Sequence, residues 1–506
     1  AGDGREGIRL AGQLRPDVVL LDNNMPGLSG REAARLMLEE APEARVLMLT
    51  VSEGSDDLIE TLRAGACGYL LKNIQAETVE KVEVITNPSA RYEAMGVSGI
   101  LNVITKKKQQ HGTDGMVSAS VANGDKYTGN LKFSNRNRFA TVYTEAGYSS
   151  KWQHTSSWSD RTITSGEKPL TESVSDTRQL YRLDAQGKAG ADIPVAGKNA
   201  LSFFVQGGSW QFSRGIDALF TATVQNNPGA TEIVTREDFK VQNNFIGGDI
   251  CYLHRFGQNK EHTLTIDIFD SYLENTSPDT YTEPELGGMQ QIDNESFRNN
   301  FRFKADYTLP VGEKNRLEAG LQADLQKSYY LYDYKVKAGD SGWISNDSLS
   351  GTMDYRRDLL AAYVVWSGQL KGIGYQLGVR AEQTIQEITY TRDPEQDNYN
   401  YFDLFPTIHL SKGFGETHQL SLSYSRRINR PTEWQLSPLL YSSDRFYLRR
   451  GNPDLRPEYI DALELGDHHV VVLEVVGEVV DELDHRRAQH VVGVGAHLEG
   501  ELGELA

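Results

Sequence analysis

The sequence contains few cysteines and no long apolar run, and both shortages restrict what the protein can be. Cys67 and Cys251 are its only cysteines and lie in segments of different composition, so neither a disulfide framework nor a metal-ligand spacing is present. No stretch of about 18 consecutive apolar residues occurs, which excludes a transmembrane helix. A β-barrel is still allowed, because its strands alternate apolar and polar residues.

Positive charge is also scarce, with 52 lysines and arginines against 70 aspartates and glutamates and a formal net charge of -18. Binding to nucleic-acid phosphates needs lysine and arginine clustered on one surface, and the lysine run at 106–108 is too short to supply it. We therefore expect no nucleic-acid partner. The residues after Ala1 show neither the basic nor the apolar region of a signal peptide, so no export signal is expected in this chain.

The composition changes twice along the chain. No lysine precedes Lys72 and none follows residue 466, although arginine occurs in both end segments. Tyr69 is the only aromatic residue in residues 1–80, and residues 467–506 contain none. Such steps suggest DNA of different origin or a change of reading frame, so we expect a chimeric or misassembled sequence. These steps give three compositions, and the motifs described below divide the chain into four expected parts: residues 1–72, 73–110, 111–466 and 467–506.

The first part has the pattern of alternating buried strands and helices. Strands are predicted at 16–22 and 45–50, each a continuous apolar run, as in parallel sheets buried on both faces. A helix is predicted after Ser29, which opens a capping-box pattern, and a second helix at 56–64 leads to a third strand at 69–72. This order predicts a doubly wound α/β fold of the flavodoxin type.

These strands end in three chemically distinct residues, Asp22, Thr50 and Lys72. The carboxyl ends of strands in doubly wound sheets border one crevice, so the three side chains should meet there. A carboxylate can accept a phosphoryl group, a hydroxyl can bond its oxygens, and an ammonium can neutralise its charge. The motifs PDVVLLD, MPGLSG, VLMLT and AGACGYLLK resemble receiver domains of two-component response regulators. The resemblance implies that Asp22 is the phosphoacceptor of a phosphorelay and that Thr50 and Lys72 are partners of the phosphoryl group.

The resemblance also shows what the first part lacks. The family's first strand, first helix and second strand are not recognised, and with them the acidic pair that helps to hold Mg²⁺. Because Mg²⁺ usually needs one or two carboxylates plus substrate phosphate in strict geometry, Asp22 alone should hold it poorly. We expect a truncated receiver that takes no phosphate from a small donor. Mg²⁺ would be its cofactor, and a histidine kinase would be its partner only if the domain were intact.

The second part contains two β-branched segments on either side of an Asn-Pro turn. We expect strands at 81–86 and 99–106, with a short helical stretch between them. Pro88 fixes a turn, and Gly96 and Gly99 occupy positions typical of tight turns. The block VEVITNPSARYEAMGVSGILNVITKK resembles the end of the plug domain of TonB-dependent outer-membrane receptors, where the chain leaves the plug for the first barrel strand. Its residues are expected to be structural and to contact no ligand.

The third part alternates apolar and polar residues in the manner of β-strands. Phe301, Phe303 and Ala305 share one face, while Arg302 and Lys304 share the other. The same alternation recurs at 264–268, 317–326, 375–381 and 420–424. Strands of about 10–20 residues are longer than those of a soluble β-sandwich, so we predict a large antiparallel transmembrane β-barrel.

Turns and loops of this barrel are also predicted. Short turns at 371–374 and 412–416 alternate with polar segments that we interpret as long loops, near 153–175, 275–295, 335–350 and 384–400. Short turns on one rim and long loops on the other are typical of outer-membrane barrels. About thirteen strands are expected, against about 22 in a plugged transporter. The predicted fold is an incomplete, open meander with bare edges after Met116 and near Leu463, which should not insert stably in lipid.

The last part, residues 467–506, has no aromatic, Ser, Thr, Asn, Lys or Pro. It contains five of the 11 histidines of the chain: His468, His469, His485, His490 and His497. Histidine-rich tracts can bind metals. A frame error explains the missing residue types equally well, so we assign no metal site to this tail.

The plug-like block and the motif SRRINRP at 425–431 imply a TonB-dependent receptor that binds a scarce large nutrient, such as a siderophore or a glycan, at the outer face. A TonB-type energy-coupling protein, whose contact box is not recognised here, would pull on the plug of a barrel surrounded by outer-membrane lipid. The expected function is transport without catalysis, and the joined pieces are not expected to function as one chain. The alternative is a cytoplasmic response regulator, which is disfavoured because no output domain is recognised after Lys72.

Overall fold

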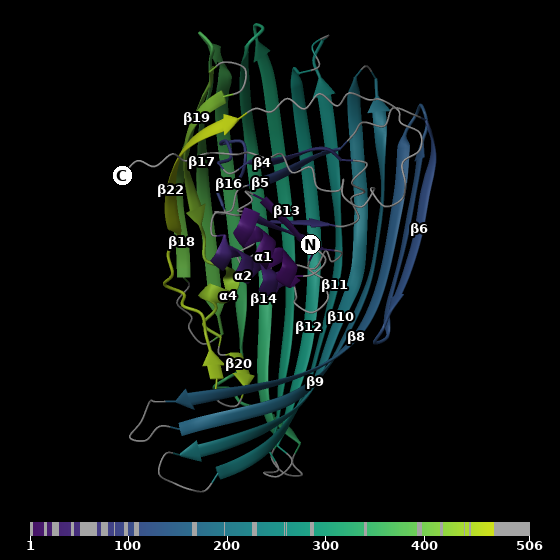
Figure 1. Ribbon diagram of the computed structural model, residues 1–506, viewed down its shortest axis with the longest axis vertical. Coiled ribbons are helices and arrows are strands. Elements are labelled where there is room, and N and C mark those ends of the chain that lie inside the picture. Colours follow the sequence, from purple (N-terminus) through teal and green to yellow (C-terminus); the bar gives the residue numbers. More distant parts are fainter. Residues whose placement is uncertain are drawn as a thin grey trace.

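The structure, a computed structural model, contains an α/β segment, a two-stranded sheet and a large antiparallel sheet (Figure 1). It describes residues 4–14, 18–22, 30–41, 45–50, 68–71, 79–85, 87–95 and 100–105, and residues 111–469 apart from 164–169, 197, 225–229, 258, 260, 284–287, 338–341, 392–396, 415–417, 440 and 445–446. Across these residues, no helix combines the length and the apolar character that crossing a membrane requires.

The first described elements form a parallel sheet with two helices. They are α1 (Gly4–Leu14), β1 (Val18–Asp22), α2 (Gly30–Glu40), β2 (Arg45–Thr50) and β3 (Gly68–Leu71). The strands pair in parallel in the order β1-β2-β3, which confirms the predicted α/β fold. Helix α1 is additional to the predicted elements. Its Ala11 lies in one apolar core with Met37 of α2 and Val46 of β2. The helix predicted at 56–64 lies outside the described residues.

The plug-like block forms a small antiparallel sheet. Its strands are β4 (Val79–Ile85) and β5 (Ile100–Thr105), close to the two predicted positions. Residues 87–95, between these strands, contain turns and bends but no helix, so the prediction of a short helical stretch was wrong. Gly96 and Gly99 lie outside the described residues.

Part of the backbone of residues 87–95 is hydrogen-bonded outside the segment. Pro88 has no N–H to donate. The Ala90 N–H donates to Oγ1 of Thr407 over 3.3 Å, and the Ala94 carbonyl accepts from the N–H of Ile428 over 3.1 Å. Thr407 and Ile428 belong to the large sheet, so these two groups bond to the sheet, while the Tyr92 N–H bonds within the segment, to the Ser89 carbonyl over 3.0 Å.

Fifteen strands form the large sheet. They are β6 (Gly112–Ala122), β7 (Lys126–Arg136), β8 (Thr141–Ile163), β9 (Leu170–Val195), β10 (Asn199–Val224), β11 (Ala230–Arg255), β12 (Thr263–Glu283), β13 (Gly288–Val311), β14 (Asn315–Lys337), β15 (Trp343–Ser345), β16 (Gly351–Leu370), β17 (Ile373–Tyr390), β18 (Asp397–Phe414), β19 (His418–Asn429) and β22 (Glu458–His469). The expected number, about thirteen, was too low. The last strand extends past residue 466, the predicted end of the barrel part.

Consecutive strands are neighbours throughout this sheet, in the order β22-β19-β18-β17-β16-β14 and onward to β6, while β15 pairs only with the end of β14. This confirms the predicted antiparallel meander. Its edge strands are β6, which contains Met116, and β22, which contains Leu463, and they do not pair with each other in the described part of the chain. Figure 1 shows a strongly curved sheet whose two edge strands, β22 and β6, lie on opposite sides. The predicted open, barrel-like architecture is therefore confirmed.

Most segments interpreted as long loops are strand instead. β8 continues to Ile163, β12 to Glu283 and β17 to Tyr390, well into the predicted loops. Polar residues remain in strands here because each backbone is hydrogen-bonded to its neighbours whatever the side chain. The connections still differ between the two rims. Those at 312–314 and 371–372 define a short-turn rim, and those at 338–350 and 430–457 define a long-connection rim.

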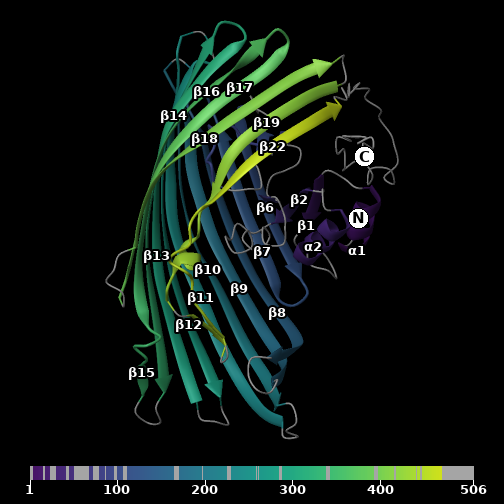
Figure 2. The ribbon, with the colours of Figure 1, turned by 90° about the vertical axis from the view of Figure 1, so that its left-hand side faces the viewer.

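The connection from β19 to β22 contains structure of its own. Its elements are the short helix α4 (Glu433–Leu436) and the paired strands β20 (Tyr441–Asp444) and β21 (Tyr447–Arg449). Figure 2 shows this connection on the concave side of the large sheet.

Candidate functional site

The two faces of the large sheet have opposite chemistry. On the face that we call outer, large apolar side chains are exposed, such as Leu321 at 58 % and Leu404 at 53 %. On the other face, which we call inner, charged and polar side chains are buried, such as Glu318 and Gln322 at 4 % each. A water-soluble protein has the reverse arrangement. A barrel in lipid exposes apolar side chains outward and keeps polar ones inside.

Strand β17 shows how the sequence produces these faces. Its apolar Leu377 and Val379 are exposed, while Arg380, Glu382 and Thr384, one residue out of phase, are buried. Because side chains alternate with a period of two, one strand can serve both faces. Residues 375–381 were predicted to alternate in this way, and the structure has the same phase.

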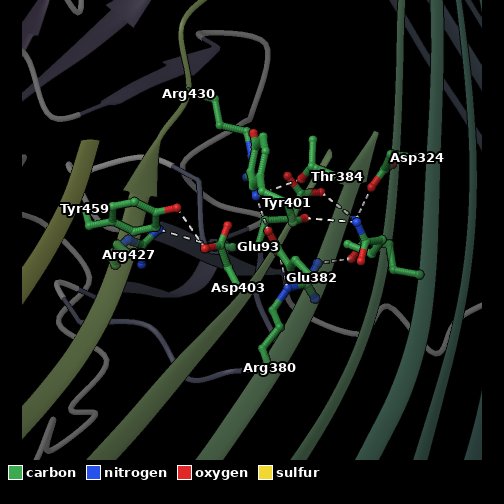
Figure 3. Close-up of polar contacts among 12 residues, drawn as sticks. Glu93, Asp324, Arg380, Glu382, Thr384, Tyr401, Asp403, Arg427, Arg430 and Tyr459 are labelled. Carbon is green, nitrogen blue, oxygen red and sulfur yellow. Dashed lines mark hydrogen bonds and ion pairs between the residues drawn. The ribbon is translucent and has the colours of Figure 1, made fainter. Parts of the chain in front are cut away.

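The deepest charged group on the inner face is a network around Glu382. Arg380 donates from Nε to one Glu382 oxygen over 2.5 Å, and Arg430 donates from Nη2 to the other over 2.6 Å. Figure 3 shows the two arginines reaching the carboxylate from opposite sides. Arg380 also donates to Gln322 over 3.1 Å, and Arg430 donates to the Tyr401 hydroxyl over 3.1 Å.

This network fixes the geometry of the inner wall more than it adds stability. Arg380, Glu382 and Arg430 have side chains only 1–2 % exposed. Removing such charges from water offsets most of their mutual attraction, but removing one partner leaves the others buried without compensation. The network joins β14, β17, β18 and the start of the β19–β22 connection, so these four elements are held in one arrangement.

The plug-like segment 87–95 lies against this inner wall. Asn87 donates from Nδ2 to Oγ of Ser423 over 2.9 Å, and Gln322 donates to the carboxylate of Glu93 over 2.9 Å. Ala90 packs with Tyr363 and with other side chains of β16 in a small buried cluster. These contacts reach β14, β16 and β19, so a segment from before the barrel crosses its interior.

Arg91 makes the charged contact of this segment. Its Nη1 donates to Glu318 over 2.8 Å, and its Nη2 lies 3.7 Å from Asp306. Burial by itself lowers the pKa of the Arg91 guanidinium, but the nearby acidic groups, Asp306 foremost, raise it above its ordinary value. Lys304 and Arg316 share the same two carboxylates, so the attraction of Arg91 is divided among several cations.

The end of the segment is held by its backbone. Met95 forms a parallel β-bridge to Ile428, and Arg427 donates to the carbonyl oxygens of Glu93 and Met95 over 3.4 and 3.3 Å. Ala94, Phe405 and Ile428 close the contact with a small buried apolar cluster. The contact is therefore mostly polar, and its apolar part is small.

The predicted receiver residues lie partly within the described structure. Asp22 is the last residue of β1 and pairs in register with Leu49, next to Thr50 at the end of β2. Parallel neighbours lie about 4.8 Å apart, so the backbones of Asp22 and Thr50 are close. β3 ends at Leu71, and Lys72 lies outside the described residues. Nothing in the structure tests the roles assigned to these three side chains.

The described residues do not form a site that fits Mg²⁺. Among them, no three His, Cys, Asp or Glu side chains lie together so that they could hold a metal ion. Of the three described strands of the α/β segment, only β1 ends in a carboxylate. We therefore derive no step through a bound metal.

Two family models match this chain, one at each of two separate ranges. Residues 254–468 match the model described as an outer membrane protein beta-barrel family, and residues 1–82 match that of the response regulator receiver domain. The chain carries an outer-membrane β-barrel domain and a receiver domain. The receiver match extends beyond residue 72, the boundary expected from the receiver motifs, and reaches into β4.

Curated relatives match the receiver domain. An uncharacterized transcriptional regulatory protein of Bacillus subtilis, YxjL, is 35% identical over 111 residues, which are 22% of this chain and 51% of that protein. The nitrate/nitrite response regulator NarL of Escherichia coli K12 is 41% identical over 81 residues, which are 16% of this chain and 38% of NarL. The chain thus spans about half or less of the length of these relatives.

Two solved structures are similar to this chain with low TM-scores. A LuxR-family two-component response regulator from Aurantimonas covers 14% of this chain and 51% of its own length, with 38% identity and a TM-score of 0.14. The ferric yersiniabactin uptake receptor FyuA of Yersinia pestis covers 90% of this chain and 81% of its own length, with 9% identity and a TM-score of 0.24.

Sequence reasoning missed the residues that form the inner-wall network. Arg380 could have been placed on the inner face, because Leu377 and Val379 beside it alternate outward. Arg430, the second arginine bound to Glu382, lies 48 residues from that glutamate, in an irregular connection. No periodic signal links these two residues, so only the structure brings them together.

Proposed function

We propose that the barrel domain and the segment before it belong to a TonB-dependent outer-membrane receptor that takes up a scarce large nutrient, such as a siderophore or a glycan. The observation that carries the proposal is the position of residues 87–95 on the inner wall, where the sequence block that resembles the end of a plug lies. The outer apolar face of the sheet supports lipid as its surroundings.

The contact between segment and wall suits a part that must be released. It depends on Arg91, on the Gln322–Glu93 hydrogen bond and on a few backbone hydrogen bonds. Arg91 is 38 % exposed, so water screens its ion pair and weakens it. A polar contact of this kind can be exchanged for water, whereas a large apolar interface would resist an applied pull. The proposed partner is a TonB-type energy-coupling protein of the inner membrane.

The experiment measures nutrient uptake in the source bacterium, with and without the gene that encodes this chain. Deletion should abolish growth on one scarce nutrient from a panel of ferric siderophores and glycans, and plasmid-borne gene should restore it. A protonophore should stop uptake of that nutrient, because the proposed receptor draws its energy from the inner membrane. Uptake that continues unchanged without proton-motive force would contradict the proposal.

A second candidate function rests on the receiver domain. The adjacent strand ends at Asp22 and Thr50 favour a phosphoacceptor site, for which a histidine kinase would be the partner. We expect Asp22 nevertheless to take no phosphate from acetyl phosphate, because β1 is the only described strand of this domain that ends in a carboxylate and Mg²⁺ would be poorly held. Intact-mass spectrometry checks this expectation. A phosphorylated species that is absent in D22N would contradict it and support the second function.

A further inference from the structure

The connection from β19 to β22 turns across the inner face of the sheet. We call its residues 432–439 the strap. Side chains of the strap contact β13, β14 and β16, and β16 is itself separated from β19 by two strands. Figures 1 and 2 show α4, the helical part of the strap, on the concave side of the sheet.

A carboxylate holds the strap to the wall. Glu433 is 7 % exposed and accepts hydrogen bonds from Gln326 and from the Tyr330 hydroxyl. Arg298 of β13 lies 3.3 Å from the same carboxylate. One residue of the strap is thus bound to three side chains of two neighbouring strands, and the charge of Glu433 is balanced by that of Arg298.

Apolar side chains hold the other end of the strap. Leu436 and Leu439 are 1 % and 8 % exposed and lie in a cluster rich in tyrosine. The wall residues of this cluster are Ile292, Tyr330, Tyr332, Tyr334, Met353, Tyr355, Ile388 and Tyr390. Most of them are close to the long-connection rim, where β13 and β16 begin and β14 and β17 end. The strap therefore covers a tyrosine-rich wall in the half of the barrel interior next to that rim.

The opposite side of the strap is exposed and has a different chemistry. Thr432, Trp434 and Gln435 are exposed, Trp434 at 54 %. The Trp434 ring meets Tyr330 edge-on, with ring centroids 5.5 Å apart and an interplanar angle of 66°. The exposed part of this ring is an apolar surface that a ligand can cover.

We propose that Trp434 is a stacking platform for a neutral, polyhydroxylated ring, a pyranose unit of an oligosaccharide, inside the barrel. The proposal deepens the proposed function, on which it rests, by naming a contact residue and a class of nutrient. The apolar face of a pyranose ring can lie on an indole. The neighbouring Thr432 and Gln435 are uncharged; the Thr432 hydroxyl donates to the side-chain oxygen of Gln435 over 3.1 Å, and the amide N–H groups of Gln435 can donate to a sugar hydroxyl.

Charge favours a neutral ligand at this position. Glu433 and Arg298 neutralise each other beneath the indole, so no free charge from this pair is presented to a ligand. Trp434 is also held in advance, because the strap residues on both sides of it, Glu433 and Leu436, are anchored to the wall. Little conformational freedom is then lost when a ring binds.

The test measures binding of two neutral probes, maltohexaose and cellohexaose, to the full chain in detergent by calorimetry and tryptophan fluorescence. At least one probe should bind and change the fluorescence. W434A should weaken this binding roughly tenfold or more, as expected for an anchoring tryptophan, and W434F, which keeps a smaller ring, should weaken it less. The matched control is W343A, because Trp343 is also exposed, at 39 %, but lies on β15 outside the strap. Circular dichroism verifies that each variant keeps its β-sheet.

Two results would overturn the inference: binding of neither hexasaccharide, or W434A binding as tightly as the unchanged protein. Loss of binding in W343A as well would overturn it too, since the effect would then not be specific to the strap. These outcomes are distinct from failure of the proposed function. If energy-dependent uptake of a nutrient is found in the source bacterium while neither probe binds, only the assignment of Trp434 and of the ligand class falls.

Discussion

Among single residues, Glu382 is the one whose substitution we expect to lower the stability of the protein most. Its carboxylate is 1 % exposed and is the shared partner of two buried arginines. Arg380 has in addition a buried Nη1 atom without a hydrogen-bond partner, so part of its bonding capacity is already unused. The network is therefore sensitive to the loss of any further acceptor.

We predict that E382A lowers the free energy of unfolding by about 3–5 kcal/mol, because it leaves two buried guanidinium groups without their counter-ion. Urea unfolding of the full chain in detergent, followed by tryptophan fluorescence, measures the change. The matched control is D217A, which removes the partner of Arg236 in an ion pair whose side chains are 56 % and 61 % exposed. The control should unfold like the unchanged protein, and an equal loss in both variants would argue against a special role for the network.

Among the elements, some long strands could be predicted from alternation of apolar and polar residues and others could not. Strand β17 alternates so regularly that its two faces follow from the sequence. Strand β8 is polar over most of its length. Its last part, from residue 153, was predicted to be a loop, although the strand pairs with β9 as far as Ile163. Its place in the sheet depends on hydrogen bonds to that neighbour, which have no signature in the sequence of β8 itself.

The outer face of β14 allows a test of the lipid surroundings. We predict that L321R destabilises the inserted protein by about 2–4 kcal/mol, because Leu321 lies six residues from the short-turn end of the strand and a charge near the bilayer midplane is costly. L370R is the matched control, since Leu370 is 65 % exposed on the last residue of β16 at that rim. It should cost about 0–1 kcal/mol. Equal effects measured by urea unfolding in lipid vesicles would contradict a membrane-embedded outer face.

For the whole molecule, the open edges of the sheet are the decisive feature. β6 and β22 pair with one large-sheet neighbour each, β7 and β19, in the described part of the chain. An unpaired strand edge within lipid costs several kcal/mol for each backbone group. The free energy of the sheet in a membrane therefore depends on whether the unpaired backbone groups of these two strands find hydrogen-bond partners.

We predict that cysteines at positions 118 and 464, one on each edge strand, form no intramolecular disulfide. The variant S118C/E464C is made with Cys67 and Cys251 replaced by serine. The control pair S423C/E464C should cross-link, because Ser423 and Glu464 face each other in register on β19 and β22, and facing residues lie within disulfide reach. Electrophoresis without reductant separates the products. A disulfide between residues 118 and 464 would show that the sheet closes on itself.

The sequence by itself determined the features that depend on local periodicity. Alternation with a period of two predicted the two faces of β14 and β17, and continuous apolar runs predicted the parallel strands that end at Asp22 and Thr50. The motifs of the receiver and of the outer-membrane barrel were recognised, and both domains were confirmed. These features can be predicted from the sequence because each depends on a short run of consecutive residues.

Only the tertiary structure decided which distant residues meet on the inner wall. Arg91 meets Glu318, Arg430 meets Glu382, and Glu433 meets Arg298, and each pair joins a connection or turn to a strand remote in the chain. Such pairs depend on the curvature of the sheet and on the path of irregular segments, which carry no periodic pattern. The inward path of residues 432–439, on which the inference about Trp434 rests, follows for the same reason from the fold and not from the sequence of the strap.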